Sequence, residues 1–140
     1  MRAVFLDYQS MKPEELDFER LAGATSVFFT HAATPPELVI ERIREFDVVI
    51  LNKVKFERSH FEAAPDLKLI LVSATGTDNV DKRAAVDHGV VVCNVAAYGT
   101  SSVSQHTLML MLMVATQAER YRNDVKASRW SKSSMFCLMD

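Results

Sequence analysis

The residues of this chain that could do chemistry gather in the stretch SATGTDNVD at 73–81. It follows the apolar run LKLILV and opens with small or hydroxyl-bearing residues, which leave the backbone N–H groups of a turn open. Gly76 permits close approach and φ/ψ values that other residues avoid. The acidic and amide residues that follow predict a helix start, where free N–H groups and the helix dipole favour an anion. The stretch therefore predicts a site for a carboxylate or small oxyanion.

Polar residues near this stretch leave alternative interpretations open. Lys53 follows the apolar run VVIL and could add positive charge at the same mouth. Thr77 or Asp78 could instead serve only as the N-cap of the next helix. Asp7 could ligate a metal, although a turn role fits it better. The histidines pair with no Cys or acid at catalytic spacing and are expected at the surface or in packing contacts: His31, His60, His88 and His106.

Composition excludes several classes of protein. The 140 residues make one domain, or one domain and part of another, with 49% hydrophobic residues and a net charge of -2. This charge is not that of a nucleic-acid-binding protein. No run reaches the roughly 18 apolar residues of a membrane span, and MRAVFLDYQ is too short for a signal peptide. Cys93 and Cys137 have apolar neighbours, which predicts reduced, buried thiols in a cytoplasmic protein.

The elements that must position the site alternate along the chain. Apolar runs of strand length occupy 3–6, 26–29, 48–51, 69–72 and 90–93, and helix-like segments occupy 13–23, 34–46, 57–65 and 79–89. Thr34 is the expected N-cap of the second helix, and Gly89 the residue that ends the fourth. Runs that are apolar on both faces predict strands covered on both sides. The pattern predicts an α/β fold, a flavodoxin-like doubly wound five-stranded parallel sheet of order 2-1-3-4-5, whose ligands collect at the carboxyl ends of the strands.

The rhythm of the sequence changes near residue 101. The segment TLMLMLMVA is apolar almost all round, which predicts a helix buried on most sides. We therefore expect a domain over 1–100 and a long C-terminal crossover helix over 101–125, with 101–140 leading out of that domain.

These residues resemble a known family. The stretch from residue 67, LKLILVSATGTDNVDKRAAVDHGVVVCNVAAYGTSSVSQHTLMLML, is similar to the N-terminal half of the D-isomer-specific 2-hydroxyacid dehydrogenases, in particular the glycerate dehydrogenase (hydroxypyruvate reductase) branch. That branch reads ATGTDNVD at the turn and VCNV at the next strand. LNKV at 51–54 resembles its TNKV, FCLMD at 136–140 resembles its FCLLD, and SVSQH at 102–106 departs from its SVAEH. The likeness runs from residue 1 to residue 140.

The resemblance implies specific roles. In this family the turn binds the substrate carboxylate through backbone N–H groups, which assigns Thr75 and Gly76 to this task, with Ala74 lining the pocket. Asn52 and Lys53 match positions at the substrate mouth. Ser102 and Val103 match the start of the next helix, which lies against the nicotinamide side of the cleft.

The resemblance also implies what these 140 residues lack. The family's catalytic Arg, acid and His and its G-x-G-x-x-G nucleotide motif have no match here, so the chain reads as a substrate domain followed by the start of an NAD(P)-binding Rossmann domain. NAD or NADP is expected in the full-length parent and no cofactor on this piece, which by itself should be inactive. Expected partners are a small 2-keto or 2-hydroxy acid and a second copy, with no nucleic acid and no membrane. The 101–125 helix is expected either to fold back on its own sheet or to be exchanged between two copies.

A second class of function stays open from the sequence, a flavodoxin-like binding or signalling module without dehydrogenase activity. A receiver domain needs a phosphate-accepting Asp after the third strand and a Lys after the fifth, where this chain has Asn52 and Cys93-Asn94. A flavodoxin needs a Ser/Thr-rich phosphate loop after the first strand, where this chain reads DYQSMK. Both patterns therefore disfavour this class.

Overall fold

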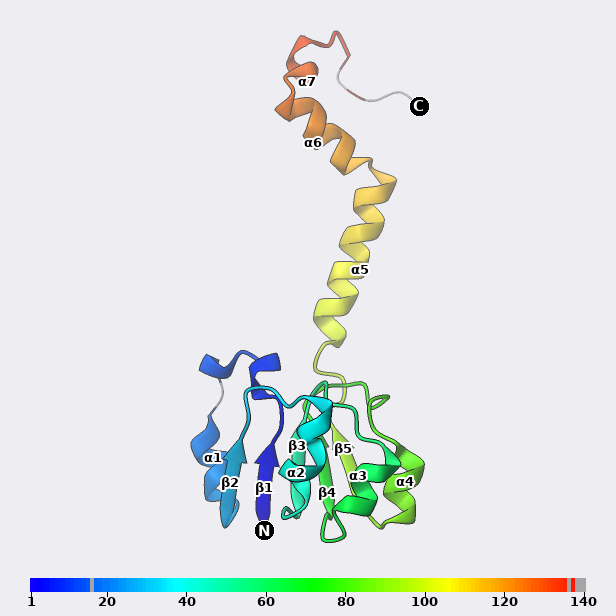
Figure 1. Ribbon diagram of the computed structural model, residues 1–140. Helices are drawn as coiled ribbons and strands as arrows, with labels where there is room; N and C mark the ends of the chain where they lie inside the picture. The colour runs from blue at the N-terminus through cyan, green and yellow to red at the C-terminus, as the bar shows by residue number, and fades with distance from the viewer. Residues whose placement is uncertain (16, 136, 138–140) are drawn as a thin grey trace. The chain divides into compact units, whose positions relative to one another are not determined.

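The computed structural model describes residues 1–15, 17–135 and 137 and divides the chain into two compact units, Met1–Ala97 and Tyr98–Asp140. The first unit is built on a parallel sheet (Figure 1). Its strands are β1 (Arg2–Phe5), β2 (Val27–Thr30), β3 (Val48–Leu51), β4 (Leu69–Val72) and β5 (Val91–Asn94). The strand order is β2-β1-β3-β4-β5, which confirms the predicted topology.

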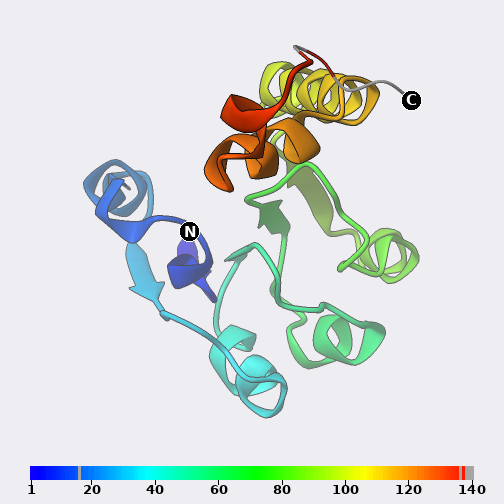
Figure 2. The ribbon, with the colours of Figure 1, turned by 90° about the horizontal axis from the view of Figure 1, so that it is seen from above.

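The helices of the first unit lie on both faces of this sheet. Figure 2 shows α1 (Phe18–Gly23) on one face and α2 (Val39–Ile43), α3 (Arg58–Ala63) and α4 (Lys82–Asp87) on the other. This split follows from the strand order, because right-handed crossovers that run in opposite directions from β1 place their helices on opposite faces.

The face under α2, α3 and α4 carries the main hydrophobic core. Every second residue of the central strands points into it, and Phe56 and Phe61 fill the space between strands and helices. Their rings meet edge to face at 4.8 Å between centroids. The strand residues of this core are fully buried: Val4, Leu6, Val49, Leu51, Ile70 and Val72. This rigid layer fixes where the strands end, and so where the loops of the site begin.

The face under α1 is covered only in part by the described residues. Phe5 and Ile50 of the central strands are buried there, with Phe18 of α1 packed against them. The cover stops toward β5, where Val91 is 57% exposed and Cys93 is exposed. The expectation of two covered faces holds for β1 and β3 and is wrong for β5. The expectation that both thiols are buried is also wrong, since Cys137 is exposed too.

Several predicted helix starts are wrong. Short 3-10 turns precede the helices, which therefore begin later in the sequence than predicted. The 13–23 segment forms a 3-10 turn at Pro13–Glu15, then α1 capped by Asp17, with residue 16 outside the described part. The 34–46 segment forms a 3-10 turn at Pro36–Leu38 before α2. Thr34 does not cap it, because its hydroxyl donates to the Leu6 carbonyl at 2.6 Å.

The second unit is helical and is not the single helix that was expected over 101–125. It contains α5 (Thr100–Ala115), α6 (Ala118–Lys126) and α7 (Arg129–Lys132). Gln117 takes a left-handed conformation, φ 51°, which ends the first helical run. The apolar side chains of α5 are exposed, Val114 by 80%, so the expected burial is not provided by the described residues. The FCLMD end lies outside the described residues except for residue 137.

No helix within the described ranges is long and apolar enough to cross a membrane.

Gly89 ends α4 as predicted, and its conformation gives a first test. Its φ is +69°, a value that costs an L-residue about 1–2 kcal/mol. We expect Gly89→Ala to lower the free energy of unfolding in urea by about this amount. Gly23→Ala is the matched control, because an added Cβ meets nothing within 4 Å at either glycine and only Gly89 has a positive φ. Equal losses in the two variants would contradict the explanation.

Candidate functional site

The sheet register brings the loops of the predicted site to one edge. Leu51 pairs with Val72, and Val72 pairs with Asn94, so the chain leaves β3, β4 and β5 at the same level. The loops that follow these strands therefore start side by side at the carboxyl edge. In an open parallel sheet this edge is where ligands bind.

The turn after β4 is fastened to the end of β5. The Val95 N–H donates to the Ala74 carbonyl at 3.1 Å, and the Thr75 hydroxyl donates to the Val95 carbonyl at 3.1 Å. The Asn94 amide donates to the Thr75 carbonyl at 2.7 Å. These bonds use carbonyl groups of the turn and leave its N–H groups unused. The N–H groups of Thr75 and Gly76 have no acceptor among the described residues, and both residues are exposed.

Two expectations about this turn need correction. The helix N-cap is Asp81, whose side chain accepts from the Ala84 N–H at 3.0 Å, so neither Thr77 nor Asp78 caps α4. Because α4 begins only at Lys82, the helix dipole does not reach the turn, and its capacity for an anion depends on the local N–H groups. Gly76 has no positive φ; an added Cβ would lie 3.0 Å from Asp78 Oδ1, so what matters here is space.

The turn after β3 is organised by Asp7, which lies two residues past the end of β1. This carboxylate is only 6% exposed. Its Oδ1 accepts from the Asn52 N–H at 2.8 Å, and its Oδ2 accepts from Lys53 at 2.6 Å and Val54 at 3.2 Å. Both oxygens are therefore occupied by backbone donors, which argues against the metal-ligand alternative. Among the described residues no group of three His, Cys, Asp or Glu side chains could hold a metal ion.

Asn79 holds the same turn from the other side. Its side-chain amide donates to the carbonyls of Asn52 at 3.1 Å and Val54 at 3.0 Å. Its own carbonyl accepts from the Phe56 N–H at 2.8 Å, within an isolated bridge between Phe56 and Val80. Asn79 belongs to the stretch 73–81, so the turns after β3 and β4 are joined by one side chain. This explains why an amide is needed inside the motif.

The predicted site residues fall into two groups. Five lie on the carboxyl edge of the first unit: Asn52, Lys53, Ala74, Thr75 and Gly76. Lys53 is exposed and makes no ion pair within the described part of the chain, whereas the Asn52 amide donates to the Ser10 hydroxyl at 2.8 Å. Ser102 and Val103 lie in the first turns of α5, in the second unit, and are exposed there.

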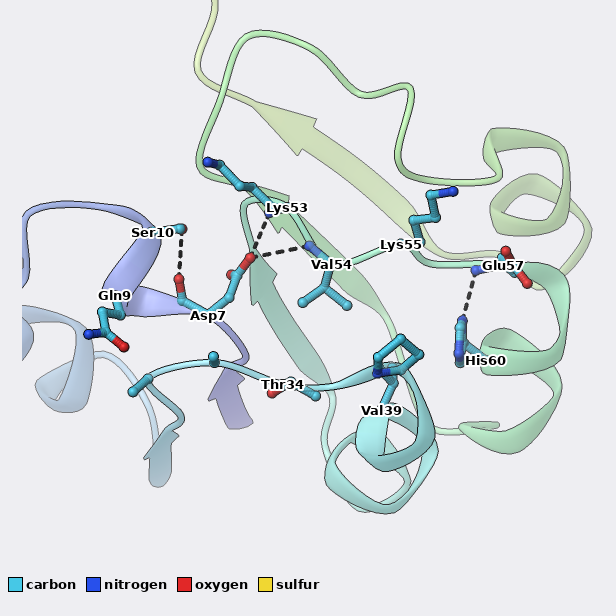
Figure 3. Close-up of a pocket in the computed structure, with 13 residues that line it drawn as sticks. Asp7, Gln9, Ser10, Thr34, Val39, Lys53, Val54, Lys55, Glu57 and His60 are labelled. Carbon is cyan, nitrogen blue, oxygen red and sulfur yellow. Dashed lines mark hydrogen bonds between the residues drawn. The ribbon is translucent and has the colours of Figure 1, made fainter.

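A groove of about 890 Å³ opens beside the Asp7 carboxylate. Figure 3 shows Asp7 and His60 at its two ends, with Thr34 and Val39 between them. Lys53 also lines it, but the 74–76 turn does not. The groove and the N–H groups of the 74–76 turn are therefore separate features, and Lys53 belongs to the lining of the groove.

The histidine at the end of this groove acts as a structural cap. His60 Nδ1 accepts from the Glu57 N–H at 2.8 Å as half of a capping box at the start of α3, and its ring lies 5.2 Å from Phe56. Burial lowers the pKa of His60, against a smaller opposing effect of Glu57. A neutral imidazole suits this role, since protonation would remove the acceptor.

The sequence missed the roles of Asp7 and Asn79. The available signals were an Asp directly after the first buried strand and an Asn inside the 73–81 stretch. Neither residue type distinguishes a backbone clamp from an ordinary turn residue.

The chain is similar in sequence to members of one enzyme family. Residues 4–134 match the family model of the D-isomer specific 2-hydroxyacid dehydrogenase, catalytic domain. Glycerate dehydrogenase of Methylorubrum extorquens is 34% identical over 99% of this chain and 43% of its own length. Hydroxypyruvate reductase of Blautia hydrogenotrophica is 32% identical over 100% of this chain and 44% of its own length.

A solved structure shares the fold. D-lactate dehydrogenase of Aquifex aeolicus, complexed with NAD and lactic acid, superposes with a TM-score of 0.76 at 19% identity, over 99% of this chain and 41% of that one. The chain belongs to the D-isomer-specific 2-hydroxyacid dehydrogenase family. It spans less than half the length of these relatives.

Acidification should destabilise the first unit through His60. Because its folded-state pKa is below the value of about 6.5 of an unfolded chain, the unfolded state binds more protons between these two values. We expect the free energy of unfolding to fall as the pH drops through about 6.5 toward the folded pKa, and to fall less steeply in His60→Gln. Urea unfolding at a series of pH values measures both slopes.

The control for this slope is His31→Gln, because burial and Arg42 lower the pKa of His31 as well. That variant should keep the contribution of His60. A His60→Gln slope equal to that of the unmodified chain would show that His60 does not report on folding.

Proposed function

We propose that this chain forms the substrate-binding part of an NAD(P)-dependent D-2-hydroxyacid dehydrogenase that reduces hydroxypyruvate or glyoxylate, or oxidises D-glycerate. One observation carries the proposal: Thr75 and Gly76 are exposed residues at the carboxyl edge of the sheet, and their adjacent N–H groups have no acceptor among the described residues. Such a pair of donors suits the two oxygens of a carboxylate. The similarity to a glycerate dehydrogenase and a hydroxypyruvate reductase supports the choice of acid.

The neighbouring residues fit this task. Ala74 is half-buried against the main core, so it anchors the turn and leaves the next two residues outside. Lys53 has no carboxylate partner among the described residues and is available to a bound anion. Asn52 shapes the mouth through its bond to Ser10. Ser102 and Val103 complete the nicotinamide side of the site in the assembled enzyme.

The redox chemistry belongs to residues outside this sequence. No G-x-G-x-x-G motif occurs in the 140 residues, and the relatives are more than twice as long. We expect the parent to bind NAD or NADP for hydride transfer and this piece alone to be inactive. Residues 101–140 are the start of the nucleotide-binding domain in this proposal. Two exposed, free thiols fit a reducing, cytoplasmic location.

Carboxylate binding can be measured directly by titrating the labelled chain with D-glycerate and following amide NMR signals. We expect the N–H signals of Thr75 and Gly76 to shift most, because those groups donate to the acid. Lys53→Met should weaken binding about fivefold, the loss of one partly screened charge. Lys55→Met is the matched control, an exposed lysine of the same loop. Glycerol, which lacks the carboxylate, should leave these signals in place; shifts with glycerol, or none with D-glycerate, would contradict the proposal.

Self-association is the second part of the proposal. The apolar side chains of α5 are exposed together on one helix, with Met111 64% exposed and Leu112 55%, and contiguous exposed apolar surface often marks an interaction site. We propose a homodimer in which α5 is exchanged between two copies. A dimer that buries these side chains would account for an apolar helix whose side chains are exposed among the described residues.

Light scattering over a range of concentrations tests the dimer. We expect the mass to rise toward twice 15.7 kDa, and Leu108→Gln with Leu112→Gln to return the chain to a monomer. Lys126→Gln on α6 is the control and should leave the dimer intact. A stable monomer at every concentration excludes exchange.

A further inference from the structure

The turn 52–54 is held by its backbone from two directions. The Asp7 carboxylate accepts all three consecutive N–H groups, at 2.8, 2.6 and 3.2 Å. The Asn79 amide donates to the carbonyls at the two ends of the turn, at 3.1 and 3.0 Å. Donors and acceptors of one short segment are thus satisfied by two side chains far from it in sequence.

These two side chains come from the elements on either side of the turn. Asp7 lies in the loop after β1, the neighbour of β3 on one side, and Asn79 lies in the loop after β4, the neighbour on the other side. Ser10 reinforces the Asp7 side, because its hydroxyl donates to the Asp7 carbonyl at 2.7 Å and accepts from the Asn52 amide at 2.8 Å. The clamp therefore fixes the turn relative to both neighbouring loops.

The clamp formed by Asp7 and Asn79 also fixes the backbone position of Lys53. Its backbone N–H makes the shortest of the three bonds to Asp7, at 2.6 Å, while its side chain is exposed and extends away from that carboxylate (Figure 3). A long lysine side chain contributes to binding only if its backbone is held, since ordering it costs conformational entropy. Asn79, in the same loop as Thr75 and Gly76, couples that backbone to the unused N–H pair.

We propose that Asp7 and Asn79 are positioning residues of the anion site, which fix Lys53 relative to the N–H groups of Thr75 and Gly76. This rests on the proposed function, because it assumes that a carboxylate binds there. Neither residue touches the ligand in this account. Their effect passes through the 52–54 backbone, so it should depend on whether Lys53 is present.

The experiment is a double-mutant cycle in the complete 140-residue chain, with D-glycerate as the probe. Binding is followed at the Thr75 and Gly76 amide signals, and folding by urea unfolding. We expect Asp7→Asn and Asn79→Ala each to weaken binding about fivefold, as much as Lys53→Met does, because their effect passes through Lys53. Lys53→Met should then add little in either background, because a lysine on a released turn no longer contributes.

Asp47→Asn is the matched control, which tests whether a loss of folding stability alone weakens binding. Asp47 also bridges elements of the sheet, accepting from the Arg2 N–H at 2.7 Å and the Lys68 ammonium at 2.9 Å, but it lies at the amino edge. We expect this variant to lower stability and to bind D-glycerate as the unmodified chain does. Equal weakening in Asp47→Asn would show that lost stability alone explains the effect and would overturn the inference.

The remaining outcomes are distinct. If the unmodified chain shifts no signal at Thr75 or Gly76, the proposed function fails, and the inference fails with it. If the unmodified chain binds but folded Asp7→Asn or Asn79→Ala binds equally well, only the inference fails. Additive losses for Lys53→Met and Asn79→Ala would also overturn it. Should Asp7→Asn not fold, the Asn79→Ala cycle decides alone, because that side chain is half-buried and holds only carbonyl groups.

Discussion

The site depends on one interaction, the buried Asp7 carboxylate that accepts three consecutive backbone N–H groups. A buried charge is stable only when hydrogen bonds replace its water, and three donors do so here. The arrangement requires β1 and β3 to be parallel neighbours that end near the same level, as the pairing of Phe5 with Ile50 ensures. Topology, register and the shape of the 52–54 turn are therefore parts of one constraint.

Hydrogen bonding also shapes the turn after β4, the proposed anion site. Its carbonyl groups accept from Asn94 and Val95, while the N–H groups of the exposed residues Thr75 and Gly76 have no acceptor among the described residues. Recognition by backbone donors needs little from side chains except that they stay small and leave room, as Gly76 does beside Asp78. In this proposal, specificity comes from groups at the rim, and Lys53 is one of them.

Much of the first unit could be predicted from sequence. Apolar runs located all five strands to within one residue, and their alternation with helical segments gave the order, because parallel sheets allow few connections. Helix starts were predicted less well, since Asp17 and Asp81 compete with other polar residues as caps and only tertiary packing selects them. The interruption between α5 and α6 at Gln117 could not be predicted, because no Gly or Pro lies near that position in the sequence.

The candidate site residues were proposed from the family resemblance, whereas the contacts that hold their loops could not be predicted. A clamp such as that of Asp7 and Asn79 joins residues far apart in sequence, and no local pattern reveals which carboxylate will meet which turn. Likewise, the exposure of Cys93 depends on which sheet face is covered near β5, a property of the whole domain. Such features become visible only with the fold.

A crystal structure of the chain grown with D-glycerate tests the central claim most directly. The account predicts one carboxylate oxygen within about 3 Å of the Thr75 nitrogen and the other within the same distance of the Gly76 nitrogen, with the Lys53 ammonium beside them and the 52–54 turn unchanged. An acid bound instead in the groove between Asp7 and His60, with the two turn nitrogens facing water, would contradict it.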